Sequence, residues 1–214
     1  MIKQDVLNAG YIRLVEHMGG DKAVVRNARR CWRSEDKSNE RSDRNLIRHL
    51  LREGHMTPFE AMVFTFDIKC PIFVARQWMR HRHASINEES LRYCVAEGDY
   101  YIPSGLGPGM DWSWKVCNDA QLSAYKYYLN QGLPKEQARA LLPMGIYTKF
   151  YWTVNGSSLM NFLKLRLDKA AQAEIREYAK AILDMVKVVA PVSFTEFVPI
   201  VLKDLVLEDL ISKD

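Results

Sequence analysis

The chain has 214 residues, 48% of them hydrophobic and 26% charged, and its 30 basic and 26 acidic side chains give a net charge of +4. A chain of this length and composition can bury a sizeable core, so we expect one globular domain over residues 1–214. The near balance of charge argues against a dedicated nucleic-acid-binding protein, and no apolar run is long enough to cross a membrane.

The start of the chain and its cysteines predict a cytoplasmic protein. The first residues lack an apolar signal region. The four cysteines are far apart and form no CxxC pair, which argues against a zinc ribbon and favours free thiols in a reducing compartment.

Two helices are expected before residue 55. The first spans residues 21–32, with Asp21 as a candidate N-cap and apolar residues at helical spacing. The second is capped by Ser42 or Asp43 and stops at Gly54.

A short helix is expected to follow at Thr57. Thr57, Pro58 and Glu60 have the spacing of a capping box with proline at the first helical position. The hydroxyl of Thr57 is either that cap or a ligand contact, and the residues alone leave both interpretations open.

Two strands are predicted among the remaining helices. Residues 62–68 alternate along the chain with apolar groups on both faces, which indicates a central strand, and residues 144–154 are rich in aromatic and β-branched side chains. The segment 94–118 is predicted to be an ordered strand or turn followed by a loop. Helices are expected from Pro71 and at about 118–130, 134–142, 158–168 and 171–189. Without repeats or linkers, this pattern predicts the α+β class.

The most polar stretch, Arg80 to Tyr93, reads Arg-His-Arg-His-Ala-Ser-Ile-Asn-Glu-Glu-Ser-Leu-Arg-Tyr. Polar groups this dense beside a predicted core helix need partners or a ligand. Guanidinium groups bind phosphate through paired hydrogen bonds, and Asn87, Glu88 and Ser90 can contact a sugar or base, so we predict a nucleotide-like ligand. Basic residues at a helix C-terminus also complement its dipole, so the first triplet alone could be structural.

Arg166 lies on the apolar stripe of the helix predicted at 158–168, where an arginine needs a partner. It could pair with a buried carboxylate, extend to solvent, or bind an anion or a polarised carbonyl of a ligand. Asn161 points roughly to the opposite side of the same ideal helix.

Two rival kinds of site are less favoured. A metal site of His81, His83 and Glu88 has a poor i, i+2 spacing, and the neighbouring arginines would repel a cation. A nucleic-acid module that stacks bases on Trp78, Tyr93 and Tyr100 disagrees with the near-balanced charge. We therefore expect no metal, no nucleic acid and no membrane partner.

The segment from Arg80 to Tyr93 resembles the signature of the flavin-dependent thymidylate synthases: Arg-His-Arg, two residues, Ser, one, Asn-Glu, one, Ser, one, Arg-Tyr. Every fixed position agrees, and similarity extends over residues 55–60, 71–79 and 142–174. The resemblance implies a small, mostly antiparallel sheet flanked by helices. It also implies a homotetramer in which several subunits build each FAD site.

The resemblance further implies an enzyme of dTMP biosynthesis. Such an enzyme methylates dUMP reductively to dTMP, with methylenetetrahydrofolate as the carbon donor and NADPH as the reductant of FAD. The signature leaves open a related product such as 5-hydroxymethyl-dUMP.

Site residues follow from the same resemblance. The implied FAD contacts are Thr57, Arg80, His81, Arg82, Glu88, Asn155, Ser157 and Asn161. The implied dUMP contacts are Gln77, Arg80, Glu88, Glu89, Ser90, Arg92, Lys149 and Arg166. Arg166 is the implied catalytic residue, because a fixed cation beside O2 and N3 would stabilise negative charge on the pyrimidine. Carbon C5 could then attack the one-carbon unit without a protein nucleophile.

Three positions depart from the family pattern. Lys149 stands where many members have arginine near the dUMP phosphate, so the charge is kept but the paired hydrogen bonds are not. Ser157 stands where some members have arginine near FAD, and Ala170 replaces a histidine near the flavin. These departures bear on the details of ligand binding more than on the reaction.

Overall fold

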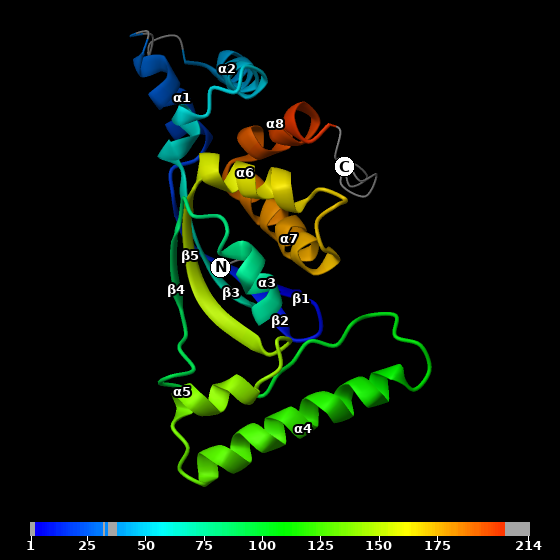
Figure 1. The fold of residues 1–214 in the computed structure, drawn as a ribbon. Coiled ribbons are helices and arrows are strands. Elements are labelled where there is room, and N and C mark those ends of the chain that lie inside the picture. Colours follow the sequence, from blue (N-terminus) through cyan, green and yellow to red (C-terminus); the bar gives the residue numbers. More distant parts are fainter. Residues whose placement is uncertain (1–2, 32, 34–37, 204–214) are drawn as a thin grey trace.

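The computed structural model describes residues 3–31, 33 and 38–203. Within them, five strands form one antiparallel sheet in the order β1-β2-β3-β5-β4 (Figure 1). The strands are β1 (Lys3–Val6), β2 (Gly10–Met18), β3 (Val63–Pro71), β4 (Ser85–Glu88) and β5 (Tyr147–Asn155). The prediction of a central strand at 62–68 is confirmed, because β3 lies in the middle of the sheet.

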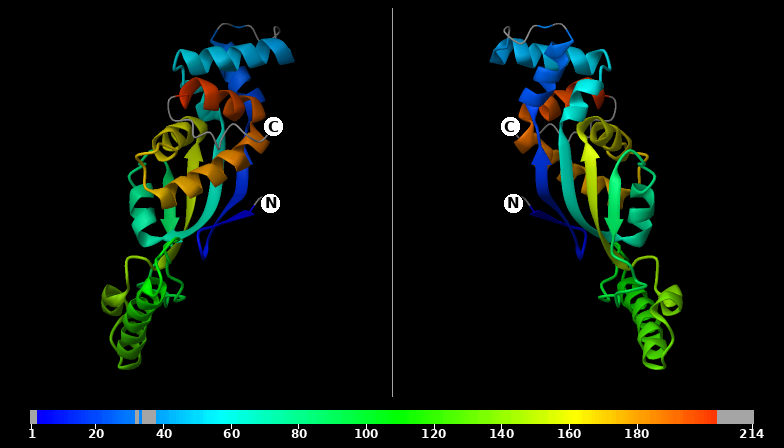
Figure 2. Two further views of the ribbon diagram at one scale, coloured as in Figure 1. Left: turned by 90° about the vertical axis from the view of Figure 1, so that its right-hand side faces the viewer. Right: turned by 90° about the vertical axis from the view of Figure 1, so that its left-hand side faces the viewer.

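Helices cover one face of this sheet (Figures 1 and 2). The covering helices are α3 (Ile72–Trp78), α6 (Gly156–Arg166), α7 (Ala173–Val189) and α8 (Pro191–Val201). We call the sheet with these four helices the body. At one end of the body lie α1 (Asp21–Arg30), α2 (Glu40–Arg52) and the 3-10 helix η2 (Thr57–Ala61).

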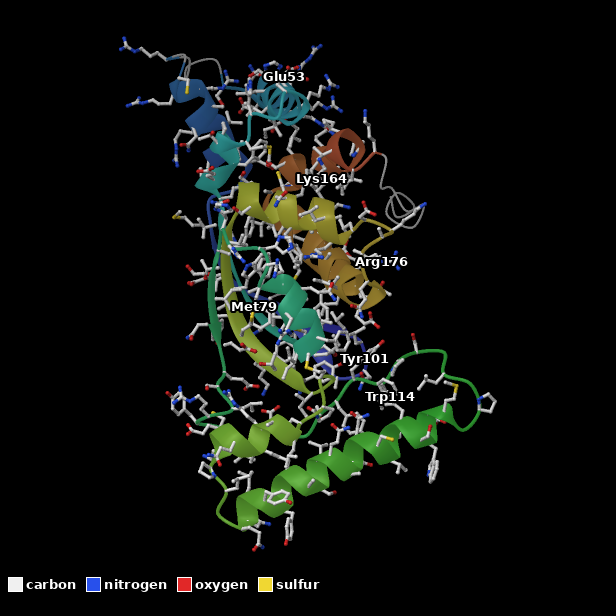
Figure 3. All side chains as sticks on the ribbon, viewed as in Figure 1. Glu53, Met79, Tyr101, Trp114, Lys164 and Arg176 are labelled. Atoms are coloured by element: carbon white, nitrogen blue, oxygen red, sulfur yellow. The ribbon has the colours of Figure 1, made fainter. Side chains whose placement is uncertain are left out.

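A helical arm projects from the other end of the sheet (Figure 2). We define the arm as α4 (Met110–Asn130), α5 (Lys135–Ala138) and the 3-10 turn η3 (Arg139–Leu141). The indole nitrogen of Trp114 on α4 donates to the carbonyl of Tyr101 at 2.8 Å, and Figure 3 labels both residues at this junction. Tyr101 in turn donates from its hydroxyl to Glu174 of α7 at 2.7 Å, so polar bonds connect the arm to the body.

The core lies between the sheet and its helical cover. Alternate residues of β3, namely Phe64, Phe66 and Ile68, are fully buried there, as the period of two in a strand requires. Trp78 of α3 and Trp152 of β5 meet edge to face, with ring centroids 5.3 Å apart. Such large aromatic side chains supply much of the apolar area that stabilises a core.

The open face of the sheet is polar. Asp67 of β3 accepts a hydrogen bond from Arg13 of β2 at 2.6 Å, and the hydroxyls of Thr65 and Thr153 lie 3.0 Å apart across β3 and β5. Because side chains alternate along a strand, β2, β3 and β5 each contribute to a polar face on one side of the sheet and to an apolar face on the other.

The caps predicted for the first two helices were wrong. Asp21 does not cap α1; its carboxylate accepts from the backbone nitrogens of Val192 and Ser193, both at 2.8 Å, and so caps α8 instead. Helix α2 is capped by Asn39, which forms a capping box with Ser42. A cap acts on whichever backbone N–H groups lie nearest in space, and sequence spacing alone does not fix that choice.

The segment at Thr57 forms the expected short helix, but as a 3-10 turn without the predicted capping box. Helix α4 begins at Met110, eight residues before the predicted start at 118, and the turn before it includes only a single bridge from Tyr100 to Ile146. The strands β1, β2 and β4 and the helix α8 were not predicted. The strands β1 and β4 have only four residues each, β2 alternates between buried and partly exposed positions only over its first six residues, and α8 is apolar on most sides.

Candidate active site

A cleft of about 780 Å³ lies where the body meets the arm. Helix α3 contributes Arg76 to its lining, Met79 follows at the end of that helix, and the arm contributes Glu136 and Arg139. Four residues from the signature segment line it as well, namely Glu88, Glu89, Ser90 and Leu91. The cleft thus combines guanidinium groups with carboxylates, which is the donor and acceptor set that a nucleotide requires.

The signature segment turns sharply beside this cleft. The carbonyl of Ser90 accepts from the backbone nitrogens of Tyr93 and Cys94, both at 2.9 Å. Arg92 follows within this turn, and its Nε lies 3.5 Å from the carboxylate of Glu136. Lys135 donates to the carbonyl of Tyr93 at 2.8 Å, so the arm and the signature segment hold each other in place.

Glu88 ends β4 and is held by a neighbouring strand. The hydroxyl of Thr148 in β5 donates to Glu88 Oε1 at 2.6 Å, and Thr148 also lines the cleft. The next residue, Glu89, donates from its backbone nitrogen to the carbonyl of Lys149 at 2.9 Å. Burial raises the pKa of the Glu89 carboxyl, while the charge of Lys149 opposes that change.

Arg166 lies at the end of α6 among neutral acceptors. Its Nε donates to Nε2 of His81 at 2.9 Å, and its Nη2 donates to the carbonyl of Gln77 at 3.1 Å. Within the described ranges no carboxylate lies within ion-pair distance of Arg166, so of the three predicted partners a buried carboxylate is not the one found. The charge of Arg166 is therefore not neutralised by those residues.

The contact with Arg166 determines the protonation state and the tautomer of His81. A guanidinium group can only donate, so Nε2 of His81 must accept and the imidazole is neutral with its proton on Nδ1. Burial, and then the charge of Arg166, lower the pKa of His81 to about 4. The ring also packs edge-on against Phe162, with centroids 4.9 Å apart.

A second, smaller pocket of about 210 Å³ adjoins His81. Its lining is His81, His83, Ala84, Trp152, Val154, Ser157, Ser158 and Asn161. It lies at the start of α6, where backbone N–H groups and the helix dipole favour anionic groups. Three of the predicted FAD contacts, His81, Ser157 and Asn161, meet in this pocket.

Asn155 and Gly156 build the start of α6. The side chain of Asn155 accepts from the backbone nitrogen of Ser158 at 2.8 Å, so this predicted FAD contact also serves as the N-cap. A Cβ atom on Gly156 would lie 2.6 Å from the carbonyl oxygen of Phe59 in η2, which only glycine avoids. This close approach packs η2, and with it the exposed Thr57, against α6.

Arg80 and Arg82 extend from the signature segment into solvent. Both side chains are exposed, and within the described part of the chain neither makes a hydrogen bond or ion pair. Polar side chains of this kind remain available to a ligand or to another subunit.

The structure divides the predicted dUMP residues into separate groups. Gln77 and Arg166 do not line the 780 Å³ cleft; the side chain of Gln77 instead donates to Gln172 at 2.5 Å. Lys149 also lies outside the cleft, on the open face of the sheet, where it pairs with Glu97. The one-residue alternation of β5 explains this placement, since Thr148 faces the cleft and Lys149 the opposite side.

Sequence reasoning missed several residues of the cleft, among them Arg76, Arg139 and Thr148. Arg139 and Thr148 lie far along the chain from the signature segment, and a lone arginine or threonine gives no local pattern. Arg76 precedes the predicted contact Gln77 and could have been found by considering both sides of α3.

Known proteins resemble this chain over most of its length. A family model described as thymidylate synthase complementing protein matches residues 13–192. The flavin-dependent thymidylate synthase of Thermotoga neapolitana is 44% identical over 205 residues, which cover 92% of this chain and 94% of that protein. The flavin-dependent thymidylate synthase of Thermosipho africanus is 45% identical over 212 residues, covering 90% and 92%.

A solved structure matches the whole architecture. The UMP/dUMP methylase PolB from Streptomyces cacaoi, bound with 5-Br dUMP, aligns with a TM-score of 0.84 at 30% identity and covers 91% of this chain and 97% of that chain. The antiparallel sheet and its helical cover are therefore those of this class of methylase. The chain belongs to the flavin-dependent thymidylate synthase family.

Two other features are absent from residues 3–31, 33 and 38–203. No helix among them is long and apolar enough to cross a membrane. No group of three or more His, Cys, Asp or Glu side chains in the same ranges could hold a metal ion.

Proposed function

We propose that this protein is a cytoplasmic flavin-dependent thymidylate synthase that methylates dUMP to dTMP, with methylenetetrahydrofolate as the carbon donor and NADPH as the reductant. The observation that carries the proposal is the cleft in which Glu88, Glu89 and Ser90 of the family signature meet Arg76 and Arg139. Relatives at 44% and 45% identity are named flavin-dependent thymidylate synthase, and PolB is described as a UMP/dUMP methylase.

The cleft offers separate groups to the two ends of dUMP. Arg139 in the lining, and Arg92 from the turn beside the cleft, can donate to the phosphate, with the hydroxyl of Ser90 beside them. The carboxylates of Glu88 and Glu89 can only accept while ionised, so they suit N–H or O–H groups of the nucleoside.

The residues around the smaller pocket fit FAD. Ser157, Ser158, Asn161 and the exposed guanidinium groups of Arg80 and Arg82 form a donor set suited to a pyrophosphate near a helix N-terminus. When bound, the flavin supplies the redox chemistry of the reaction. The residues of this chain bind it and orient it.

The protein itself offers no suitable cysteine nucleophile. Cys70 is buried, and burial together with the charge of Glu88 raises the pKa of its thiol well above the usual value. The exposed residues Cys31, Cys94 and Cys117 do not line the 780 Å³ cleft. This arrangement supports a route in which Arg166 stabilises negative charge on the pyrimidine and the substrate carbon is the nucleophile.

We include a homotetramer with shared sites in the proposal. The pocket beside α6 measures about 210 Å³, below the roughly 300 to 1,000 Å³ of typical cofactor pockets. Arg166 and Gln77 also lie outside the cleft that holds Ser90. Both observations are accounted for if a second copy brings its Arg166 to the cleft and completes the flavin pocket.

The absorption spectrum of the purified protein, recorded before and after addition of dUMP, tests the proposal. We expect a flavin band that changes shape with dUMP, and a product with the mass of dTMP. The Ser90→Ala variant should need more dUMP for the same spectral change while its FAD content is unchanged. A protein that cannot be reconstituted with FAD would contradict the proposal, and a product with the mass of 5-hydroxymethyl-dUMP would change its final step.

A further inference from the structure

Thr148 is a nearly buried polar residue at the edge of the cleft. Its exposed fraction is 3%, and across the sheet it pairs with Cys70 of β3, which is fully buried. A hydroxyl in such surroundings needs a hydrogen-bond partner. It finds one in Glu88 Oε1, at 2.6 Å.

Glu88 has a different environment. The residue is exposed, and it ends β4 opposite Phe150 of β5. Its second carboxylate oxygen, Oε2, has no hydrogen-bond or ion-pair partner within the described ranges. Arg76 and Arg139 line the same cleft without pairing with Glu88. The carboxylate is therefore held at one oxygen and available at the other.

Holding one oxygen restricts a flexible side chain. An unheld glutamate samples several rotamers, and ordering it on ligand binding costs free energy. A hydrogen bond from a rigid, buried β-branched residue lowers that cost, because Thr148 has few rotamers of its own in a strand. The hydrogen bond is also charge-assisted, which makes it stronger than a neutral one.

We propose that Thr148 is a positioning residue, which orients the Glu88 carboxylate so that Oε2 accepts a hydrogen bond from a sugar hydroxyl or ring N–H of the bound nucleotide. The inference rests on the proposed function, because dUMP is the ligand toward which Glu88 is oriented. Thr148 itself needs no contact with the nucleotide.

The test compares three threonine variants of the FAD-loaded enzyme by calorimetric titration with dUMP. Thr148→Val removes the hydroxyl at nearly constant shape and should weaken dUMP binding by about threefold to tenfold, the cost of ordering one freed side chain on binding. Thr148→Ser keeps the hydroxyl and should restore affinity to within about twofold of wild type. Thr153→Val removes the hydroxyl that meets Thr65 on the open face of the same strand, and should leave dUMP affinity unchanged.

A double-mutant cycle separates positioning from general damage to the strand. In a Glu88→Ala background, which removes the held group, Thr148→Val should cause no further loss of dUMP affinity. In steady-state kinetics Thr148→Val should raise KM for dUMP more than it lowers kcat, since the residue acts on binding.

Several outcomes would overturn the inference. Unchanged dUMP affinity in Thr148→Val is one, and an equal loss with and without Glu88 is another. If Thr148→Val does not fold, Thr148→Ala and the Glu88→Ala background supply the same comparison. Wild-type enzyme that binds no dUMP would instead contradict the proposed function, and the two failures are thereby distinguished.

Discussion

The aromatic residues of the body and of the arm have opposite surroundings. In the body, Trp78 is fully buried and its ring lies 4.9 Å from that of Phe162. In the arm, Trp112 is 69% exposed, and the long helix α4 buries only Asn118, Leu122 and Tyr125. The body is therefore stabilised by its own packing, whereas the arm is attached mainly by polar bonds. One wall of the cleft comes from the body and the other from the arm. The wall from the body is packed against the core, whereas the wall from the arm is held by a few hydrogen bonds.

The largest difference between the two regions is expected in the free energy of unfolding when one tryptophan in each is replaced by alanine. Trp78→Ala should lower the free energy of unfolding by about 3 to 5 kcal/mol, because it leaves a cavity in the aromatic core. Trp112→Ala should change it by less than about 0.5 kcal/mol, because little is buried around that ring. Urea unfolding followed by circular dichroism measures both, and similar losses for the two variants would contradict the contrast.

Arg166→Ala tests whether the body supplies catalysis as well as stability. We expect at least a hundredfold loss of turnover, about 2.7 kcal/mol in transition-state stabilisation, with the flavin retained. Lys164→Ala is the matched control, since Lys164 is an exposed cation on the same helix. Retained turnover in Arg166→Ala would remove its proposed role.

The contact between His81 and Arg166 should make the stability of the body depend on pH. The pKa of His81 falls from its usual 6.5 to about 4 in the folded protein, mainly through burial. Between these values the unfolded chain binds the proton and the folded chain does not, so stability is full above pH 6.5 and decreases toward pH 4.

Unfolding at pH 7 and pH 5 measures this effect. The loss between the two should be smaller in His81→Asn, which keeps an acceptor for Arg166 but cannot titrate. An equal loss in both proteins would show that other groups cause the pH dependence.

The smallest expected effect concerns the cap of α6. Asn155→Ala should cost about 1 kcal/mol of stability, since the backbone nitrogen of Ser158 loses its partner. Asn161→Ala, at an exposed position of the same helix, should cost less than about 0.5 kcal/mol. Thermal unfolding of the flavin-free proteins compares the two, and a larger loss for Asn161→Ala would contradict the assignment of the cap.

Patterns with a short period could be predicted from the sequence, and contacts between distant segments could not. The central position of β3 followed from apolar groups on both of its faces. The start of α4 was missed because an exposed helix has no apolar stripe to mark it. In the site, Ser90 followed from its motif, whereas Thr148 was missed beside the predicted Lys149. Neighbouring residues of β5 point to opposite faces of the sheet, so Thr148 lines the cleft while Lys149 lies on the open face.

The carboxylate of Asp21, which caps α8, also bears on the order of events during synthesis. Val192 and Ser193 follow Asp21 by 171 and 172 residues. At typical rates of translation, roughly ten to thirty seconds pass between the emergence of the two segments. Until then α1 lacks its partner α8, and the new chain must avoid aggregation while these two helices are apart. The contact between α1 and α8 can therefore form only after residues 192 and 193 have been synthesised.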